Sequence, residues 1–157
     1  MKLMAKVFVA LSGGVDSSVA AFLLKRAGND VACVFMRFWQ DRENACCSLE
    51  SERRARIMAI NLKTPFYIFD FRKEFKKEIV DYFLKKTRLG LTPNPCVVCN
   101  KKIKLGLFLK KALDLGADYV ATGHYVYKEK NRALYFRSCP FCCYKYSTSN
   151  KPHGRLF

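Results

Sequence analysis

Four short apolar runs, separated by longer segments of helical periodicity, constrain the fold of this chain more than any other feature. Each run is rich in β-branched and aromatic residues, which is typical of strands buried in a parallel sheet. The longer segments place apolar residues three and four positions apart, as on one face of a helix. The alternation predicts an α/β fold, a doubly wound parallel sheet with helices on both faces. The expected strands are residues 6–11, 31–36, 65–69 and 118–121.

The helices are expected between these strands, at residues 17–26, 49–62, 74–86 and 100–115. Ser48 is suited to cap the second of them, because a serine hydroxyl can accept a hydrogen bond from the first turn. Glu50 and Glu52 in that turn also favour a helix start there. In the last helix the expected apolar stripe is Leu105, Phe108, Leu109, Ala112 and Leu113.

A glycine-rich string, LSGGVDSS (residues 11–18), lies between the first expected strand and the first helix. Gly13 and Gly14 allow a backbone to approach a phosphate closely, and a helix N-terminus offers free N–H groups. The string also carries an acidic residue, Asp16, which suits magnesium binding or helix capping. The motif Gly-Lys-Ser/Thr is missing, so the string is not a Walker A loop. Hydroxyl donors to a phosphate are expected from Ser12, Ser17 and Ser18.

The net charge of the chain is +16, from 29 Lys and Arg against 13 Asp and Glu. An excess of this size favours a polyanionic partner such as nucleic acid. The composition, half of it hydrophobic, argues against disorder. No apolar run approaches the roughly 20 residues of a membrane helix, and the first residues do not resemble a secretory signal. The sequence therefore indicates a cytoplasmic protein.

The eight cysteines gather mostly in close pairs. Without a secretory signal, such pairs indicate metal binding, a cluster or catalysis more than a disulfide framework. They are Cys46-Cys47, Cys96-x-x-Cys99 and Cys139-x-x-Cys142-Cys143, with Cys33 alone.

Three strings together carry a family resemblance. SGGVDSS is the signature of the PP-loop ATP pyrophosphatases, which split ATP between its α and β phosphates. With TPNPCVVCNK (residues 92–101) and ATGHY (residues 121–125), the chain from about residue 6 to 128 resembles the tRNA-specific 2-thiouridylase family (MnmA/TrmU). The resemblance implies an adenine nucleotide alpha hydrolase-like, Rossmann-like PP-loop domain over residues 1–130.

The resemblance also implies roles for particular residues. Met36 would contact the adenine, although it could equally be a core methionine. Gly123 would border the nucleotide, where a side chain would collide with it. Cys99 matches the nucleophilic cysteine. The phosphates would be held by Ala10, Leu11, Ser12, Gly13, Gly14, Val15, Asp16 and Ser17, and the target base would lie near Asn94, Pro95 and Cys96.

The reaction implied is 2-thiolation of the wobble uridine in tRNA. The base would be flipped out, adenylated on its C2 oxygen with ATP and magnesium, and then attacked by persulfide sulfur. Cys99 is expected at a helix start beside Lys101 and Lys102, which would favour a thiolate. The implied partners are tRNA and a cysteine desulfurase or sulfur-relay carrier.

Cys96 is a departure from the family pattern, since many members carry Asp there. The resulting Cys96-x-x-Cys99 suits catalysis by both thiols, a disulfide or persulfide pair, an iron–sulfur cluster, or zinc. These alternatives remain open at the level of sequence.

The second departure lies at the C-terminal end. The Lys-Asp-Gln segment, the second catalytic cysteine and the further domains of the family do not follow. Residues 131–157 are an irregular, basic, Cys-rich tail, as truncation with a shifted reading frame would produce; alternatively, Cys139 and Cys142 could join a metal site. Competing interpretations are a catalytically incomplete fragment that binds ATP or RNA, and another PP-loop enzyme.

Several smaller signals allow two interpretations each. His124 suits a structural hydrogen bond or proton transfer. Phe38 and Trp39 could stack on a base or nucleotide, or pack their loop down. The group Lys101, Lys102 and Lys104 could touch RNA phosphates or form the solvated side of a helix.

Overall fold

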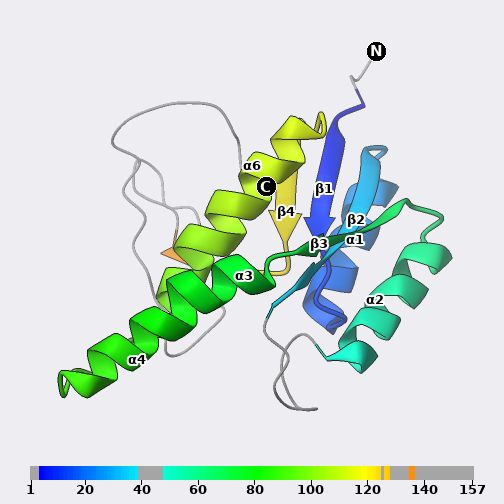
Figure 1. Ribbon diagram of the computed structural model, residues 1–157. Coiled ribbons are helices and arrows are strands. Elements are labelled where there is room, and N and C mark those ends of the chain that lie inside the picture. The colour runs from blue at the N-terminus through cyan, green and yellow to red at the C-terminus, as the bar shows by residue number, and fades with distance from the viewer. Residues whose placement is uncertain (1–3, 39–47, 125, 128–134, 137–157) are drawn as a thin grey trace.

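The computed structural model describes residues 4–38, 48–124, 126–127 and 135–136, and its centre is a four-stranded parallel sheet (Figure 1). The strand order across the sheet is β3-β2-β1-β4. Each observed strand differs from its expected range by at most one residue at either end, so the predicted strands are confirmed. They are β1 (Lys6–Ala10), β2 (Asp30–Arg37), β3 (Phe66–Asp70) and β4 (Tyr119–Thr122).

The register of the sheet brings several strand ends to one edge. Ala10, the last residue of β1, pairs with Val34 of β2 on one side and with Thr122 of β4 on the other. The next strand pair ends with Arg37 beside Asp70. Because all four strands are parallel, the segments that follow them meet at this carboxyl edge, where such sheets bind ligands.

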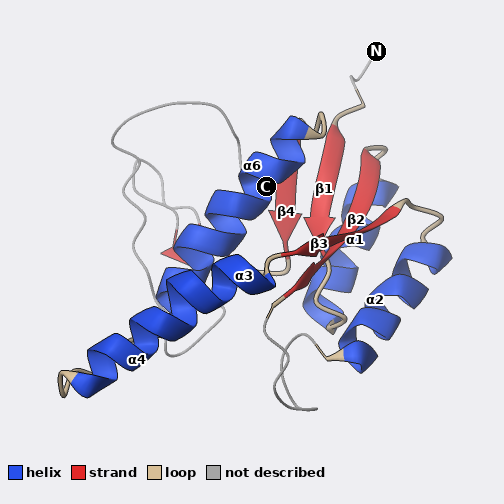
Figure 2. Ribbon diagram, in the orientation of Figure 1, coloured by secondary structure: helices blue, strands red, loops and turns tan. Residues whose placement is uncertain are grey.

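Helices cover both faces of the sheet, as Figures 1 and 2 show, so the doubly wound architecture is confirmed. On one face, Val9 packs with Ala21 of α1 (Val15–Arg26) and Ala55 of α2 (Leu49–Asn61). On the other face, Phe8 packs with Phe108 from the helices between β3 and β4. The alternation of neighbouring residues between two buried clusters is what a strand covered on both faces requires.

The helices between β3 and β4, which cover the second face of the sheet, form two helical segments. Each segment contains a π-helical stretch, in which hydrogen bonds join residues five apart. In both segments the helix continues through that stretch without a break. The first consists of α3 (Arg72–Phe75), η1 (Lys76–Val80) and α4 (Asp81–Arg88), and the second of α5 (Pro95–Cys99), η2 (Asn100–Leu107) and α6 (Phe108–Asp114).

The π-helical stretch changes which residues of the last helix are buried. The fully buried positions are Ile103, Phe108 and Ala112, spaced five and then four residues apart. The expected stripe is therefore wrong in part, because it omitted Ile103 and included Leu113, which is 37% exposed. An α-helical period was applied to a segment whose turns are wider.

The start of α2 agrees with expectation. Ser48 caps the helix, and its hydroxyl accepts a hydrogen bond from the N–H of Ser51 at 3.2 Å. This cap fixes the helix end that lies beside the glycine-rich string.

A short antiparallel pair, β5 (Val126–Tyr127) with β6 (Tyr135–Phe136), follows the sheet. Among the described residues, no helix is both long and apolar enough to span a membrane. Several residues that the sequence singled out lie outside the described ranges: Trp39, Cys46, Cys47, Cys139, Cys142, Cys143 and His153.

Candidate nucleotide site

A pocket of about 250 Å³ opens at the carboxyl edge of the sheet. Its walls come from the ends of β1, β2 and β4, from the glycine-rich string and α1, and from η2. Most of the residues expected at the nucleotide are brought together here, including Met36 and Gly123, which are far apart in the sequence. The lining residues are Ala10, Leu11, Ser12, Gly14, Asp16, Ser17, Phe35, Met36, Phe38, Lys104, Thr122, Gly123 and His124.

Gly13 does not line this pocket, although it was expected at the phosphates. Its backbone has φ +76°, and a Cβ there would lie 2.3 Å from the carbonyl oxygen of Ser51 in α2. Arg54 of α2 also donates from Nε to the Gly13 carbonyl at 3.2 Å. Gly13 is thus required for the close packing of the string against α2. Val15 does not line the pocket either, and 77% of its surface is exposed.

The buried hydroxyl of Ser17 holds the string in shape. It accepts a hydrogen bond from the N–H of Ser12 at 3.2 Å and donates to the Gly14 carbonyl at 3.1 Å. The Ser18 hydroxyl donates to the same carbonyl at 2.9 Å, and Ser18 does not line the pocket. The pocket therefore receives hydroxyls from Ser12 and Ser17, while the expected contribution of Ser18 goes to the loop itself.

Gly123 closes the pocket on the β4 side. A Cβ at this position would lie 2.5 Å from the backbone nitrogen of Ser17 and 2.9 Å from the carbonyl carbon of Asp16. The expected reason for a glycine was collision with a nucleotide. In the structure, the first collision is with the start of α1, so Gly123 allows β4 to approach the glycine-rich string.

His124 follows Gly123 and shares a hydrogen bond of 2.7 Å between its Nδ1 and the hydroxyl of Thr122. Burial, with a smaller contribution from the charge of Lys104, lowers the pKa of His124 to about 4. The imidazole is therefore neutral at pH 7. The contact with Thr122 matches the structural alternative that the sequence allowed.

Four lining residues were not assigned to the nucleotide by the sequence. A fifth, Phe38, was expected either to stack on a base or nucleotide or to pack its loop down. Its ring stacks on that of Phe75 at 5.1 Å between centroids, which agrees with the packing alternative. Lys104 comes from a helix distant in sequence, so no local pattern could place it beside the string. The others are Phe35, Thr122 and His124; a position at or just after a strand end is the signal that could have found them.

Cys96 and Cys99 lie on the helix that carries Lys104, but neither lines the pocket. The expected helix start at residue 100 is wrong: α5 begins at Pro95, and the Asn94 side chain caps it by accepting from the N–H of Val97 at 3.3 Å. Cys96 is therefore in the first turn, whereas Cys99 lies inside a continuous helix.

The surroundings of Cys99 also differ from expectation. Lys102, expected to favour its thiolate, is paired with Glu78. Cys99 is half-buried against the core, and Cys96 is exposed. No disulfide joins them, so the structure does not support the disulfide that was one of the alternatives. Asn94 and Pro95, which were expected near the target base, do not line the pocket either.

Metal binding can be tested against the donors present. Within the described ranges, no three His, Cys, Asp or Glu side chains are grouped as metal ligands. Cys96 and Cys99 alone do not complete the ligand set of an iron–sulfur cluster or a structural zinc ion. Asp16 places a single carboxylate at the pocket. One carboxylate is enough for a magnesium ion whose other ligands are substrate phosphates and water.

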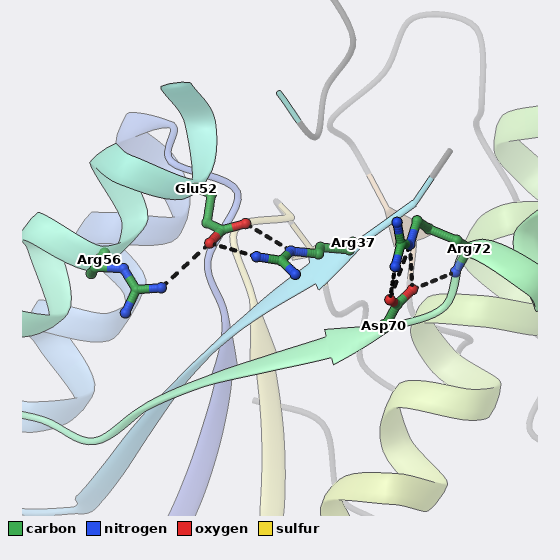
Figure 3. Close-up of polar contacts among 5 residues, drawn as sticks. All are labelled: Arg37, Glu52, Arg56, Asp70 and Arg72. Atoms are coloured by element: carbon green, nitrogen blue, oxygen red, sulfur yellow. Dashed lines mark hydrogen bonds and ion pairs between the residues drawn. The ribbon is translucent and has the colours of Figure 1, made fainter. Parts of the chain in front are cut away.

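Ion pairs fasten the elements next to the site, as Figure 3 shows. Arg37, at the end of β2, donates to both carboxylate oxygens of Glu52 in α2 at 2.9 and 3.0 Å, and Arg56 adds a contact at 3.4 Å. The hydrogen bonds from Arg37 lower the pKa of Glu52. Asp70 and Arg72 form a second pair at the end of β3, and hydrogen bonds from Arg72 lower the pKa of Asp70 to about 2.

The parallel sheet, its edge pocket and the string SGGVDSS that lies there together define an α/β protein of the PP-loop, adenine nucleotide alpha hydrolase-like class. Within this class the chain belongs to the family described as "tRNA methyl transferase HUP domain", whose model matches residues 5–138. The tRNA-specific 2-thiouridylase MnmA of Clostridium kluyveri is 52% identical over 131 residues, which cover 80% of this chain. The chain spans 37% of the length of that relative. The family resemblance drawn from the three strings is therefore confirmed.

Solved structures agree on the fold. A glutamine-dependent NAD+ synthetase from Acinetobacter baumannii in complex with ADP superposes with a TM-score of 0.55 and 19% identity, covering 76% of this chain and 22% of that one. The U34-tRNA thiolase NcsA from Methanococcus maripaludis, solved with its [4Fe-4S] cluster, has a TM-score of 0.54 and 23% identity, covering 76% and 38%. At these identities the likeness concerns the fold alone.

Proposed function

We propose that this chain is the ATP-binding and adenylating part of a tRNA 2-thiouridine synthetase. One observation carries the proposal: the glycine-rich string, Met36 and Gly123 form a single pocket in a chain about half identical to a protein named 2-thiouridylase. We place the domain in residues 1–130, in a cytoplasmic protein.

The pocket offers the groups that ATP needs. Backbone N–H groups of the string and the N-terminus of α1 would bind phosphate oxygens. Met36, at the end of β2, would contact the adenine. Asp16 would hold magnesium together with phosphate oxygens, and the ion would offset negative charge there.

In the first step of the reaction, the C2 oxygen of the wobble uridine attacks the α-phosphorus of ATP, and pyrophosphate leaves. In the second, the terminal sulfur of a persulfide on Cys99 attacks C2, and AMP leaves. Cys96 lies three residues before Cys99 on the same face of the helix. Its thiolate would attack the Cys99 sulfur, which leaves the terminal sulfur on the base and forms a disulfide that an external thiol reduces.

The partners follow from charge and chemistry. A net charge of +16 suits the phosphates of tRNA. A cysteine desulfurase or a sulfur-relay carrier would load Cys99 with sulfur. The family description names methyl transfer, whereas the Clostridium kluyveri relative is named for thiolation. Two cysteines on the helix that also carries the pocket residue Lys104 favour thiolation.

The test is to incubate the anaerobically purified chain with ATP, magnesium, unmodified tRNA, a reducing thiol, and a cysteine desulfurase with cysteine, which loads Cys99 with persulfide sulfur. Pyrophosphate release and 2-thiouridine are measured for the wild type, for Cys99→Ser and Cys96→Ser, and for Lys110→Met as a control on an exposed helix position. The expected result is 2-thiouridine that requires Cys99. Pyrophosphate release alone would restrict the chain to adenylation, and ATP binding without either product would identify a nucleotide-binding fragment. A methylated base, formed when a methyl donor is supplied, would contradict the proposal.

A further inference from the structure

The pocket is lined by the glycine-rich string, which lacks the lysine that a Walker A loop would place there. Among the described residues that line the pocket, Lys104 is the one Lys or Arg. It belongs to η2, which lies in the helix layer opposite α1. The string with α1 and the side chain of Lys104 therefore approach the pocket from opposite faces of the sheet.

The packing of η2 explains how Lys104 reaches the pocket. Ile103 and Phe108 are fully buried, and they anchor the helix at positions one π-helical turn apart. Lys104 stands next to the Ile103 anchor and is half-buried. By contrast, Lys101 and Lys102 are exposed, and Lys102 pairs with Glu78.

The ammonium group of Lys104 makes no hydrogen bond or ion pair with any other described residue. Its charge is close enough to His124, another lining residue, to contribute to the lowered pKa of that imidazole. A half-buried cation that has no counterion among the described residues gains most from an anion that enters the same pocket.

We propose that Lys104 binds the phosphates of the nucleotide from the side of the pocket opposite the glycine-rich string. The inference rests on the proposed nucleotide function of the pocket and deepens it. It also gives the helix of Cys99 a link to the nucleotide, since Lys104 lies one π-helical turn after Cys99. Phosphate binding by Lys104 would hold in place the helix that carries the thiols.

The experiment compares the binding of ATP and of adenosine by calorimetry for the wild type, Lys104→Met, Lys104→Arg and Lys110→Met. Loss of a charge-assisted contact to phosphate should weaken ATP binding by roughly 10- to 100-fold in Lys104→Met. Adenosine has no phosphate, so its affinity should stay unchanged. Lys104→Arg should retain most of the ATP affinity, and Lys110→Met should behave like the wild type.

Two outcomes would overturn the inference while leaving the proposed function intact: unchanged ATP affinity in Lys104→Met, or equal losses for ATP and adenosine, which would indicate a structural role. Thermal unfolding of each variant identifies a general loss of folding. A wild-type chain that binds neither ATP nor adenosine would overturn the proposed function of the pocket, and the inference with it.

Discussion

At the scale of single residues, the carboxyl edge of the sheet depends on side chains whose surroundings differ from those of a free amino acid. His124 is held neutral by burial and by Lys104, and Asp70 is held ionised by Arg72. Gly123 matters for a different reason, the side chain that it lacks. His124 and Gly123 each lead to a measurable expectation.

His124 should make the protein less stable as the pH falls from about 6.5 to about 4. Its folded pKa of about 4 lies below the ordinary value of 6.5, so in this window the unfolded chain binds a proton that the folded chain does not. The free energy of unfolding, measured by urea titration across the window, should fall less steeply in His124→Gln. Asp70 does not obscure the effect, because the stabilisation from its lowered pKa is lost at lower pH, between about pH 3.8 and pH 2. Equal slopes for both proteins would show that His124 is not held neutral.

Gly123→Ala should destabilise the fold, because the new Cβ would lie 2.5 Å from a backbone atom of Ser17. Overpacking of this kind costs about 1–3 kcal/mol. Gly14→Ala is the matched control, since its Cβ would meet only the Ser12 hydroxyl at 3.3 Å and its φ is negative. Urea unfolding should show a clear loss for Gly123→Ala and a smaller one for Gly14→Ala, and the reverse order would contradict the proposed packing.

At the scale of elements, α2 holds the glycine-rich string in place. Its first turns carry the Ser51 carbonyl against Gly13 and the Arg54 hydrogen bond to the same glycine. Glu52, 8% exposed, ties the helix to β2 through Arg37. In the helix layer on the other face of the sheet, η2 determines that Ile103 faces the core and that Lys104 lines the pocket.

Glu52→Gln should lower the free energy of unfolding by about 1–3 kcal/mol, because it weakens charged hydrogen bonds to a partly buried arginine. Glu50→Gln is the control on the same helix turn, since Glu50 is 59% exposed and contacts Arg54 at 3.7 Å. That exposed pair should contribute little. Chemical unfolding at pH 7 compares the two, and equal losses would mean that the pair between Arg37 and Glu52 does not hold α2 on the sheet.

At the scale of the whole molecule, charge and size guide the expectations. The chain carries 29 Lys and Arg and spans 37% of the length of the Clostridium kluyveri relative. The described part is a sheet with two helix layers and a pocket at one edge. Binding of a large polyanion would therefore involve surface charge far beyond the pocket itself.

The affinity for tRNA should fall at least roughly tenfold between about 0.05 and 0.2 M salt, because binding to phosphates releases counterions. Fluorescence anisotropy of labelled tRNA measures this dependence. Adenosine, which is uncharged, serves as the ligand whose affinity should hardly respond to salt. A tRNA affinity independent of salt would contradict the view that the basic surface contacts the tRNA backbone.

The amino-acid sequence by itself determined the four strands, the cap at Ser48 and the glycine-rich string, because strand burial, helix capping and tight turns are read over a few neighbouring residues. Only the tertiary structure decided that Gly13 allows close packing against α2 and that Gly123 allows close packing against the start of α1. Both roles depend on contacts between segments that are distant in the sequence. It also decided that Lys104 reaches the pocket and that Cys99 lies within a helix rather than at its start. A π-helical turn changes which side chains of a helix face the core, and the packing of a helix layer on the sheet changes which distant side chains reach the pocket. Neither leaves a local signal in the order of the residues.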